Sequence, residues 1–113
     1  MTPSTDTDAT TVAPPPLPDG LVAVVKRDCP TCATVAPVLA DLAGRVPLTV
    51  YTQDDPSFPP GLTPVDDTSL TVSWHHRIDT VPTLLRVAGG VEQARLEGWE
   101  RTQWQDFTGQ TVL

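Results

Sequence analysis

Hydrophobic residues along this chain occur first in a continuous run and then at helical spacing. The run LVAVV covers residues 21–25, and a short run of this kind, rich in β-branched residues, is typical of a central strand covered on both faces. The next large apolar residues recur at intervals of three and four, at Val35, Val38, Leu39 and Leu42. This spacing predicts a helix that begins near Pro30 and ends near Gly44.

Beyond this helix, the pattern predicts a second strand, a loop and a short helix. Residues 47–53 (PLTVYTQ) combine β-branched and aromatic residues, as strands do. Four prolines within residues 54–66 favour a loop without regular structure. The loop follows a strand that we expect to be parallel to the first, so it should emerge at the same sheet edge as the first helix. Residues 67–77 (DTSLTVSWHHR) predict a short helix capped by Asp67 or Thr68.

The last third of the chain predicts a β-hairpin and one more helix. Residues 82–88 and 91–97 flank the pair Gly89-Gly90. Two consecutive glycines supply the positive φ angles of a tight primed turn, which predicts a hairpin between the two segments. Residues 100–107 (ERTQWQDF) then predict a short final helix.

These elements give the order β-α-β-α-β-β-α and define one α/β domain over residues 21–113. With 113 residues and 39% hydrophobic content, the chain can form one domain with a single core. Residues 1–20 are dominated by Thr, Pro and Asp. Such a segment buries too little apolar surface to offset its ordering entropy, so we predict a flexible tail that ends at Gly20.

The charge and the apolar pattern disfavour several classes of partner. The formal net charge of -7 argues against nucleic acid and anionic membranes, because both bind basic surfaces. The longest apolar run has five residues, whereas a bilayer span needs roughly 20. No Lys or Arg precedes Lys26, and no apolar stretch typical of a secretory signal is found. We therefore expect a cytoplasmic protein. We separately expect a monomer, and we expect no organic cofactor, because no glycine-rich phosphate loop follows a strand.

Both cysteines of the chain, Cys29 and Cys32, lie between the first strand and the first helix. A β-α-β crossover points the amino end of that helix at the carboxyl edge of the sheet. Its unpaired N–H groups and its dipole favour a thiolate there. Cys29 is therefore the candidate nucleophile, and Cys32, one helical turn deeper, is the candidate resolving thiol. Pro30 fits the first helical position, where its missing N–H costs nothing.

Two other interpretations of the cysteine pair stay open at this point. A buried structural pair, or half of a zinc site, would also place two cysteines at this spacing. The remaining candidate zinc ligands are His75 and His76. Neighbouring residues on a helix point about 100° apart, so both rarely bind one ion. We expect no metal, and His76 is a candidate titrating neighbour of the cysteines.

Three motifs, in this order along the chain, resemble the thioredoxin superfamily. The segment CPTCATVAPVLADLA, residues 29–43, is similar to its active-site helix, including a proline five residues after the second cysteine, here Pro37. TVPTLL, residues 80–85, resembles its cis-proline loop. GGVEQARLEGW, residues 89–99, resembles the hairpin and the glycine that border its substrate groove. The resemblance covers residues 21 to 107.

The resemblance implies a thioredoxin-like fold, a minimal three-layer sandwich around a central mixed sheet. It implies that the Val81–Pro82 peptide bond is cis and packs against the cysteine pair. In the family, the backbone of the residue before this proline pairs with an extended substrate segment by strand addition, a task that would fall to Val81. Thr80, Gly98 and Trp99 would complete the substrate-binding residues.

The activity implied by the resemblance is thiol–disulfide oxidoreduction. The partners would be proteins that carry a disulfide or a dithiol, together with an unidentified reductase or low-molecular-weight thiol. The direction of electron flow depends on the reduction potential of the pair. A thioredoxin-like redox sensor or protein-binding module without turnover is the alternative function.

The residues around the cysteines depart from thioredoxin itself. Asp28 stands where the family usually has a tryptophan, and Ala23 stands where it has a buried acid on the preceding strand. Without that acid, the proton acceptor for the second cysteine is unassigned. The dipeptide Pro30-Thr31 replaces the Gly-Pro of thioredoxin. Asp28, Pro30 and Thr31 are therefore candidate active-site neighbours whose effect differs from that in the family.

The three tryptophans are candidates for the core or for a binding surface. We expect Trp74 and Trp104 in the core, with Phe107 on the same helical face as Trp104. Trp99 directly follows Gly98. It is expected either in the core or on the rim of the substrate groove, where an exposed aromatic side chain makes a good anchor.

Overall fold

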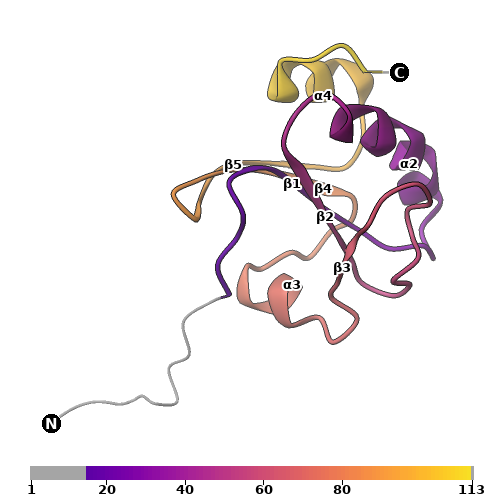
Figure 1. Ribbon diagram of the computed structural model, residues 1–113, viewed down its shortest axis with the longest axis vertical. Coiled ribbons are helices and arrows are strands. Elements are labelled where there is room, and N and C mark those ends of the chain that lie inside the picture. Colours follow the sequence, from indigo (N-terminus) through magenta and orange to yellow (C-terminus); the bar gives the residue numbers. More distant parts are fainter. Residues whose placement is uncertain (1–14, 113) are drawn as a thin grey trace, which may run out of the picture.

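A computed structural model describes residues 15–112 of the chain, and the first 14 residues of the predicted tail lie outside this range. Three helices and five strands follow one another along the described chain (Figure 1). Their order is β1 (Gly20–Val25), α2 (Pro30–Ala43), β2 (Leu48–Thr52), β3 (Val65–Asp66), α3 (Thr71–His75), β4 (Thr83–Ala88), β5 (Val91–Glu97) and α4 (Arg101–Thr108). None of the helices within the described range has the length and apolar character needed to cross a membrane.

The five strands form one mixed sheet in the order β3-β2-β1-β4-β5. β1 pairs with β2 in parallel and with β4 in the antiparallel direction. The β1 residue Ala23 lies opposite Val50 on one side and Leu84 on the other. The five residues that follow Gly20 in β1 are all buried, as expected for a strand with neighbours on both sides and layers on both faces. The central position predicted for residues 21–25 is confirmed.

Two apolar clusters cover the two faces of the sheet. α2 and α4 lie over one face, where Leu39 and Trp104 pack with Ala23. α3 lies over the opposite face, where Ile78 packs with Val22 and its neighbours. Figure 1 shows the sheet strands passing between α2 and α4 above and α3 below. The predicted three-layer α/β sandwich is therefore present.

The local signals in α2 and in the hairpin hold in the structure. α2 runs from Pro30 to Ala43 and ends at Gly44. All four residues of its predicted apolar stripe are buried. The turn between β4 and β5 is Gly89-Gly90, and the two glycines have positive φ angles of 62° and 76°. Residues with a Cβ adopt such angles only under strain. These two predictions rest on spacing and on backbone freedom, and both are confirmed.

The prediction of a loop over residues 54–66 is wrong for its last two residues. Val65 and Asp66 form the short strand β3, in which Val65 pairs with Tyr51 and Asp66 with Thr52 in parallel. Both β3 residues are exposed, so no hydrophobic pattern marks them. A two-residue edge strand is held by backbone hydrogen bonds to its neighbour, and these do not depend on side-chain type.

The helix predicted within residues 67–77 is present but shorter. Asp67, one of the two predicted capping residues, does accept N–H groups of its first turn, although the residue at the N-cap position is Leu70. α3 begins after Leu70, which has a left-handed φ of 62°. The apolar side chain of Leu70 makes no capping hydrogen bond to the helix. Asp67, which is 1% exposed, accepts the N–H groups of Val72 and Ser73 at 2.9 Å each. Asp67 thus satisfies the helix start from upstream of the N-cap position, because the chain turns back before the helix begins.

The three tryptophans have different environments. Trp104 is fully buried, as predicted, and Phe107 packs against the same cluster. Trp74 is 76% exposed, so its predicted place in the core is wrong. α3 has only five residues, and it turns Ser73 toward the protein while its neighbour Trp74 points about 100° away from that direction.

The segment before β1 packs against the sheet, although it was predicted as part of the tail. Leu17 is 4% exposed and belongs to the same cluster as Val22. The carbonyl of Pro15 lies 2.7 Å from the Nε2 atom of His76, and the carboxylate of Asp19 accepts the N–H of Gly90 at 2.9 Å. Residues 15–20 therefore pack on the folded domain through the buried Leu17 side chain and these polar contacts.

We predict that Leu17→Ala lowers the free energy of unfolding by about 2 kcal/mol, because the substitution removes buried apolar contacts and leaves a cavity. Chemical denaturation followed by tryptophan fluorescence measures the change. The matched control is Leu70→Ala, since Leu70 is 46% exposed and should cost less than about 0.5 kcal/mol. Equal stability of the two variants would show that Leu17 does not dock.

Candidate active site

Cys29 and Cys32 lie where β1 gives way to α2. Cys29 is the N-cap residue of α2 with an extended backbone, and Pro30 follows within the first helical turn. The N–H of Cys32 donates to the Cys29 sulfur at 3.3 Å. The sulfur thus occupies the position in which capping side chains receive the free N–H groups of a helix. These N–H groups and the helix dipole favour negative charge at that point.

The two cysteines differ in exposure. Cys29 is partly exposed, whereas Cys32 is fully buried, and both are free thiols. The pKa of Cys32 is raised from its ordinary value of 9.0 to about 12, chiefly by burial. The N–H of Lys26 acts in the opposite direction, and the neighbouring Cys29 and Asp54 add to the increase. This N–H donates to the Cys32 sulfur at 3.5 Å. At neutral pH, one sulfur is therefore accessible and the other is a buried, protonated thiol.

The loop before β4 lies against Cys29. The Cys29 sulfur is 3.9 Å from the carbonyl oxygen of Val81. The Val81–Pro82 peptide bond is cis, and Val81 is partly buried against the same cluster that contains Cys32. Residues that are 52 positions apart in the sequence thus form one surface, since β4 begins at the sheet edge where β1 ends.

The end of the hairpin is tied to this loop. The N–H of Gly98 donates to the carbonyl of Pro82 at 2.8 Å, and the indole N–H of Trp104 donates to the carbonyl of Gly98 at 2.9 Å. Gly98 has a φ of 85°, and a Cβ placed on it would meet no atom within 4 Å. Trp99 is partly buried, and its ring meets the ring of Trp104 edge to face at 5.1 Å. Gly98 and Trp99 therefore form a hydrogen-bonded border next to Pro82, with open space on the Cβ side of Gly98.

The other predicted neighbours are only partly close to the pair. Asp28, Pro30 and Thr31 adjoin the cysteines and are exposed. Thr80 is also exposed, and its carbonyl accepts the hydroxyl of Thr83, which fixes the start of the loop. Asp28, Pro30 and Thr31 are therefore near Cys29 by their place in the chain, and Thr80 directly precedes Val81.

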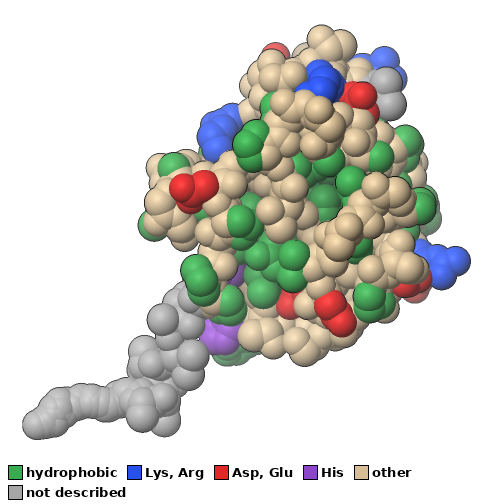
Figure 2. Space-filling view, viewed as in Figure 1, with side chains coloured by type: hydrophobic (Ala, Val, Ile, Leu, Met, Phe, Trp, Pro, Cys, Tyr) green, Lys and Arg blue, Asp and Glu red, His purple; other side chains and the backbone are tan. Residues whose placement is uncertain are grey.

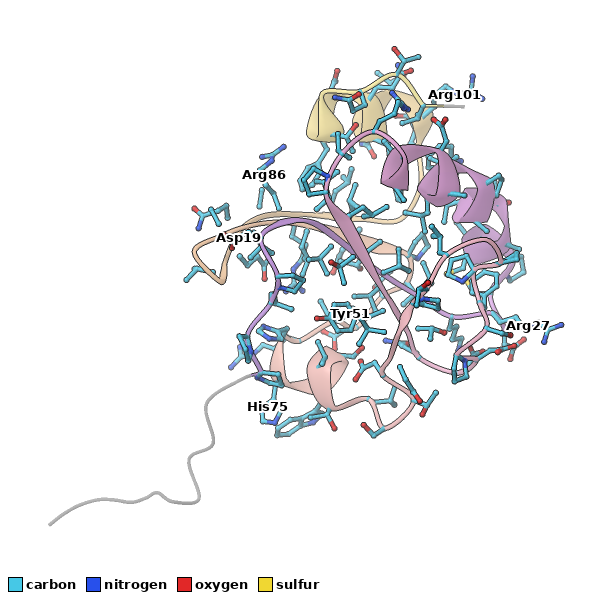
Figure 3. The ribbon with its side chains drawn as sticks, viewed as in Figure 1. Asp19, Arg27, Tyr51, His75, Arg86 and Arg101 are labelled. Atoms are coloured by element: carbon cyan, nitrogen blue, oxygen red, sulfur yellow. The ribbon has the colours of Figure 1, made fainter. Side chains whose placement is uncertain are left out.

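The ring of His76 has a hydrogen-bond partner other than the cysteine sulfurs. It follows the last residue of α3, and its ring bonds to the carbonyl of Pro15. Figure 3 shows the adjoining His75, in α3, away from Arg27, which extends into solvent from the loop that leads into α2. Within residues 15–112, no three or more His, Cys, Asp or Glu side chains are grouped to hold a metal ion.

Sequence reasoning did not single out Asp54 as a site residue. It follows β2, and its carboxylate oxygens accept the N–H groups of Arg27 and Asp28 at 2.7 Å and 2.9 Å. The loop that begins at Asp54 was expected at this sheet edge, which is the signal that could have found it. The two hydrogen bonds of the Asp54 carboxylate depend on the conformation of the loop, and no pattern in the sequence specifies that conformation.

The face shown in Figure 2 has charged side chains dispersed around its rim, with hydrophobic side chains gathered toward the middle. Lys and Arg side chains form no continuous basic area on this face. A dispersed distribution of this kind provides no electrostatic footprint for a polyanion there.

Comparison with known proteins gives matches in structure only. No protein-family profile matches the chain, and no curated protein matches its sequence. The crystal structure of oxidized thioredoxin O2 from Arabidopsis thaliana superposes with a TM-score of 0.54 and 22% identity, over 80% of this chain and 71% of that one. Reduced thioredoxin from Schistosoma mansoni gives a TM-score of 0.55 and 18% identity, over 80% and 78% of the two chains. The chain therefore has a thioredoxin-like fold.

Proposed function

We propose that this protein is a thiol–disulfide oxidoreductase that exchanges disulfides with partner proteins through Cys29 and Cys32. One observation carries the proposal: the accessible Cys29 sulfur caps α2 and receives the N–H of Cys32, whose own sulfur is buried one turn behind. A capped, accessible sulfur suits the attacking thiolate, and a shielded second thiol suits the resolving step. The thioredoxin-like fold supports the same activity.

The first half-reaction forms a mixed disulfide. The Cys29 thiolate attacks one sulfur of a partner disulfide, so that a bond from Cys29 to the partner forms and the partner's own S–S bond breaks. The partner's second sulfur leaves as a thiolate and takes up a proton. Because Cys29 is partly exposed and Cys32 is buried, the partner reaches Cys29 first.

The second half-reaction releases the reduced partner. Cys32 loses its proton and attacks the Cys29 sulfur, so that the Cys29–Cys32 bond forms and the partner's remaining sulfur leaves and is protonated. Two electrons and two protons pass to the partner in total. After burial, the charge and hydrogen bonding of Cys29 contribute to the high pKa of Cys32. A mixed disulfide removes that charge, which makes Cys32 easier to ionise at the step that needs it.

The partner segment would bind along the loop before β4. Val81 lies beside the Cys29 sulfur, and its backbone is the proposed edge for an added strand of the partner, with Thr80 and Pro82 on either side. Gly98 is open on its Cβ side, and Trp99 stands next to it as the proposed anchor. The bond between Gly98 and Pro82 supports one continuous binding surface.

We place this activity in the cytoplasm, where cellular thiols are kept reduced. The protein would act as a monomer, and a reductase or a low-molecular-weight thiol would regenerate the dithiol. The dithiol form of Cys29 and Cys32 is the form that reduces a partner.

We predict that the protein catalyses the reduction of insulin by dithiothreitol, and that Cys32→Ser traps a mixed disulfide with insulin whereas Cys29→Ser traps none. The reason is that Cys29 forms the bond to the partner and Cys32 breaks it. Non-reducing gel electrophoresis and mass spectrometry detect the trapped species.

Equal trapping by the two variants would contradict the assigned roles. If the wild-type protein forms the Cys29–Cys32 disulfide but insulin is reduced no faster than by dithiothreitol alone, the protein is not an oxidoreductase of this kind. That result would instead favour the redox sensor or binding module.

We also predict that iodoacetamide at about pH 8 modifies one thiol in the folded, reduced protein and two in urea. Burial holds the pKa of Cys32 near 12. A thiol stays protonated at a pH well below its pKa, so Cys32 remains unreactive until the pH rises toward that value. Peptide mass spectrometry after the reaction locates the label. Equal labelling of both cysteines in the folded protein would contradict the buried resolving thiol.

A further inference from the structure

Asp54 connects the loop after β2 to the loop that leads into α2. One oxygen of its carboxylate accepts the N–H of Arg27 and the other accepts the N–H of Asp28. These two residues directly precede Cys29, and the Cys29 N–H donates to the carbonyl of Arg27 at 2.8 Å. The backbone from Arg27 to the N-cap is therefore held at three successive N–H groups, and Asp54 binds two of them.

Two charge-assisted bonds to adjacent N–H groups fix the direction of this backbone. The N-cap position of Cys29 depends on that direction, because the sulfur must lie over the first helical turn to receive the N–H of Cys32. β2 is parallel to β1, so Asp54 approaches from the neighbouring strand end and is not part of the segment that it holds.

Asp55, the next residue, has different contacts. Its carboxylate binds the guanidinium of Arg27 at 2.9 Å and accepts the N–H of Ser57 at 2.9 Å. It therefore contacts a side chain in front of the site and its own loop, and it has no hydrogen bond to the backbone N–H groups that precede Cys29. The two adjacent aspartates thus offer a matched comparison of equal charge.

We propose that Asp54 is a positioning residue for the thiol pair, whose carboxylate holds the backbone of Arg27 and Asp28 so that the Cys29 sulfur caps α2. This role rests on the proposed function, because positioning matters for a sulfur that reacts. Asp54 does not contact the reacting sulfurs through any hydrogen bond among residues 15–112, so it acts through the backbone.

The negative charge of Asp54 acts on thiolate formation in the direction opposite to that of its positioning role. It contributes to raising the pKa of Cys32, after burial and the contributions of Cys29, and a negative charge near any thiol disfavours the thiolate. Removal of the charge alone would therefore increase thiolate formation at the site. Loss of the backbone position held by Asp54 would instead decrease thiolate formation at Cys29, because the sulfur would leave the N-terminal N–H groups of α2. The direction of the change separates the two effects.

The experiment measures iodoacetamide alkylation of Cys29 in the full chain with Cys32→Ser as background. The ratio of the rate at about pH 7 to the rate at about pH 10 reports thiolate stabilisation, since ordinary thiols are largely ionised at the higher pH. A change in sulfur accessibility alone affects both rates and cancels. We expect Asp54→Asn to lower this ratio by about threefold or more, because its amide can accept only one of the two N–H groups.

Two further variants complete the test, with circular dichroism as the check that each is folded. Asp55→Asn, the control, should change the ratio by less than about twofold, because its carboxylate accepts no hydrogen bond from the backbone N–H groups that precede Cys29 and is exposed to solvent screening. Asp54→Glu keeps the charge but moves the carboxylate outward by one methylene, so it should also lower the ratio. An unchanged or higher ratio in Asp54→Asn, or an unchanged ratio in Asp54→Glu, would overturn the positioning role.

These measurements use no partner protein, so they are independent of the test of the proposed function. Turnover of insulin by the wild-type chain together with an unaffected ratio in the Asp54 variants would refute the positioning role alone. A lowered ratio without turnover in the wild-type chain would support the positioning role and refute the oxidoreductase function.

Discussion

The pairing of β1 with a parallel strand on one side and an antiparallel strand on the other determines where the candidate site forms. Val25 of β1 lies opposite Thr52 at the end of β2, and Val24 lies opposite Thr83 at the start of β4. The chain therefore leaves β1 and β2, and enters β4, at one edge of the sheet. Three segments that are distant in the sequence meet there, and only these strand directions bring them together.

Each segment contributes a different part of the site. The segment after β1 provides the sulfurs and the amino end of α2. The segment after β2 provides the carboxylate of Asp54, and the segment before β4 provides the carbonyl of Val81 beside the Cys29 sulfur. Trp104 in α4 fixes Gly98 from the other side of this loop. The helices thus hold the border of the site while the sheet sets its position.

The parts of this structure that could be predicted from the sequence are those with local signals. β1 is marked by its apolar run, α2 by its spacing, and the hairpin by two glycines, so all three were predicted with the correct limits to within one or two residues. The N-cap position of Cys29 followed from the same signals. The contact of Val81 with Cys29 was implied by the resemblance to thioredoxins and not by any local pattern.

The parts that could not be predicted depend on contacts between distant segments. β3 consists of two exposed residues and exists because β2 offers free backbone groups. Leu17 stands alone among prolines, and its burial depends on a cluster formed by strands that follow it. Trp74 is large and apolar, yet α3 is too short to bury more than one face. In each case, the deciding interaction lies outside the window in which a hydrophobic pattern can be read.

The environment of Cys32 is one place where this chain departs from the family that it resembles. Ala23, fully buried in β1, stands where the family has a buried acid, so no carboxylate on the strand can accept the Cys32 proton. Burial therefore dominates the high pKa of this thiol, and the remaining influences come from Cys29, Asp54 and the Lys26 N–H. In the proposed reaction, the influence of Cys29 changes, because its sulfur would lose its charge on bonding to a partner. Under the proposed function, ionisation of Cys32 would thus be coupled to formation of the mixed disulfide, because the charge on Cys29 that opposes it would be lost at that step.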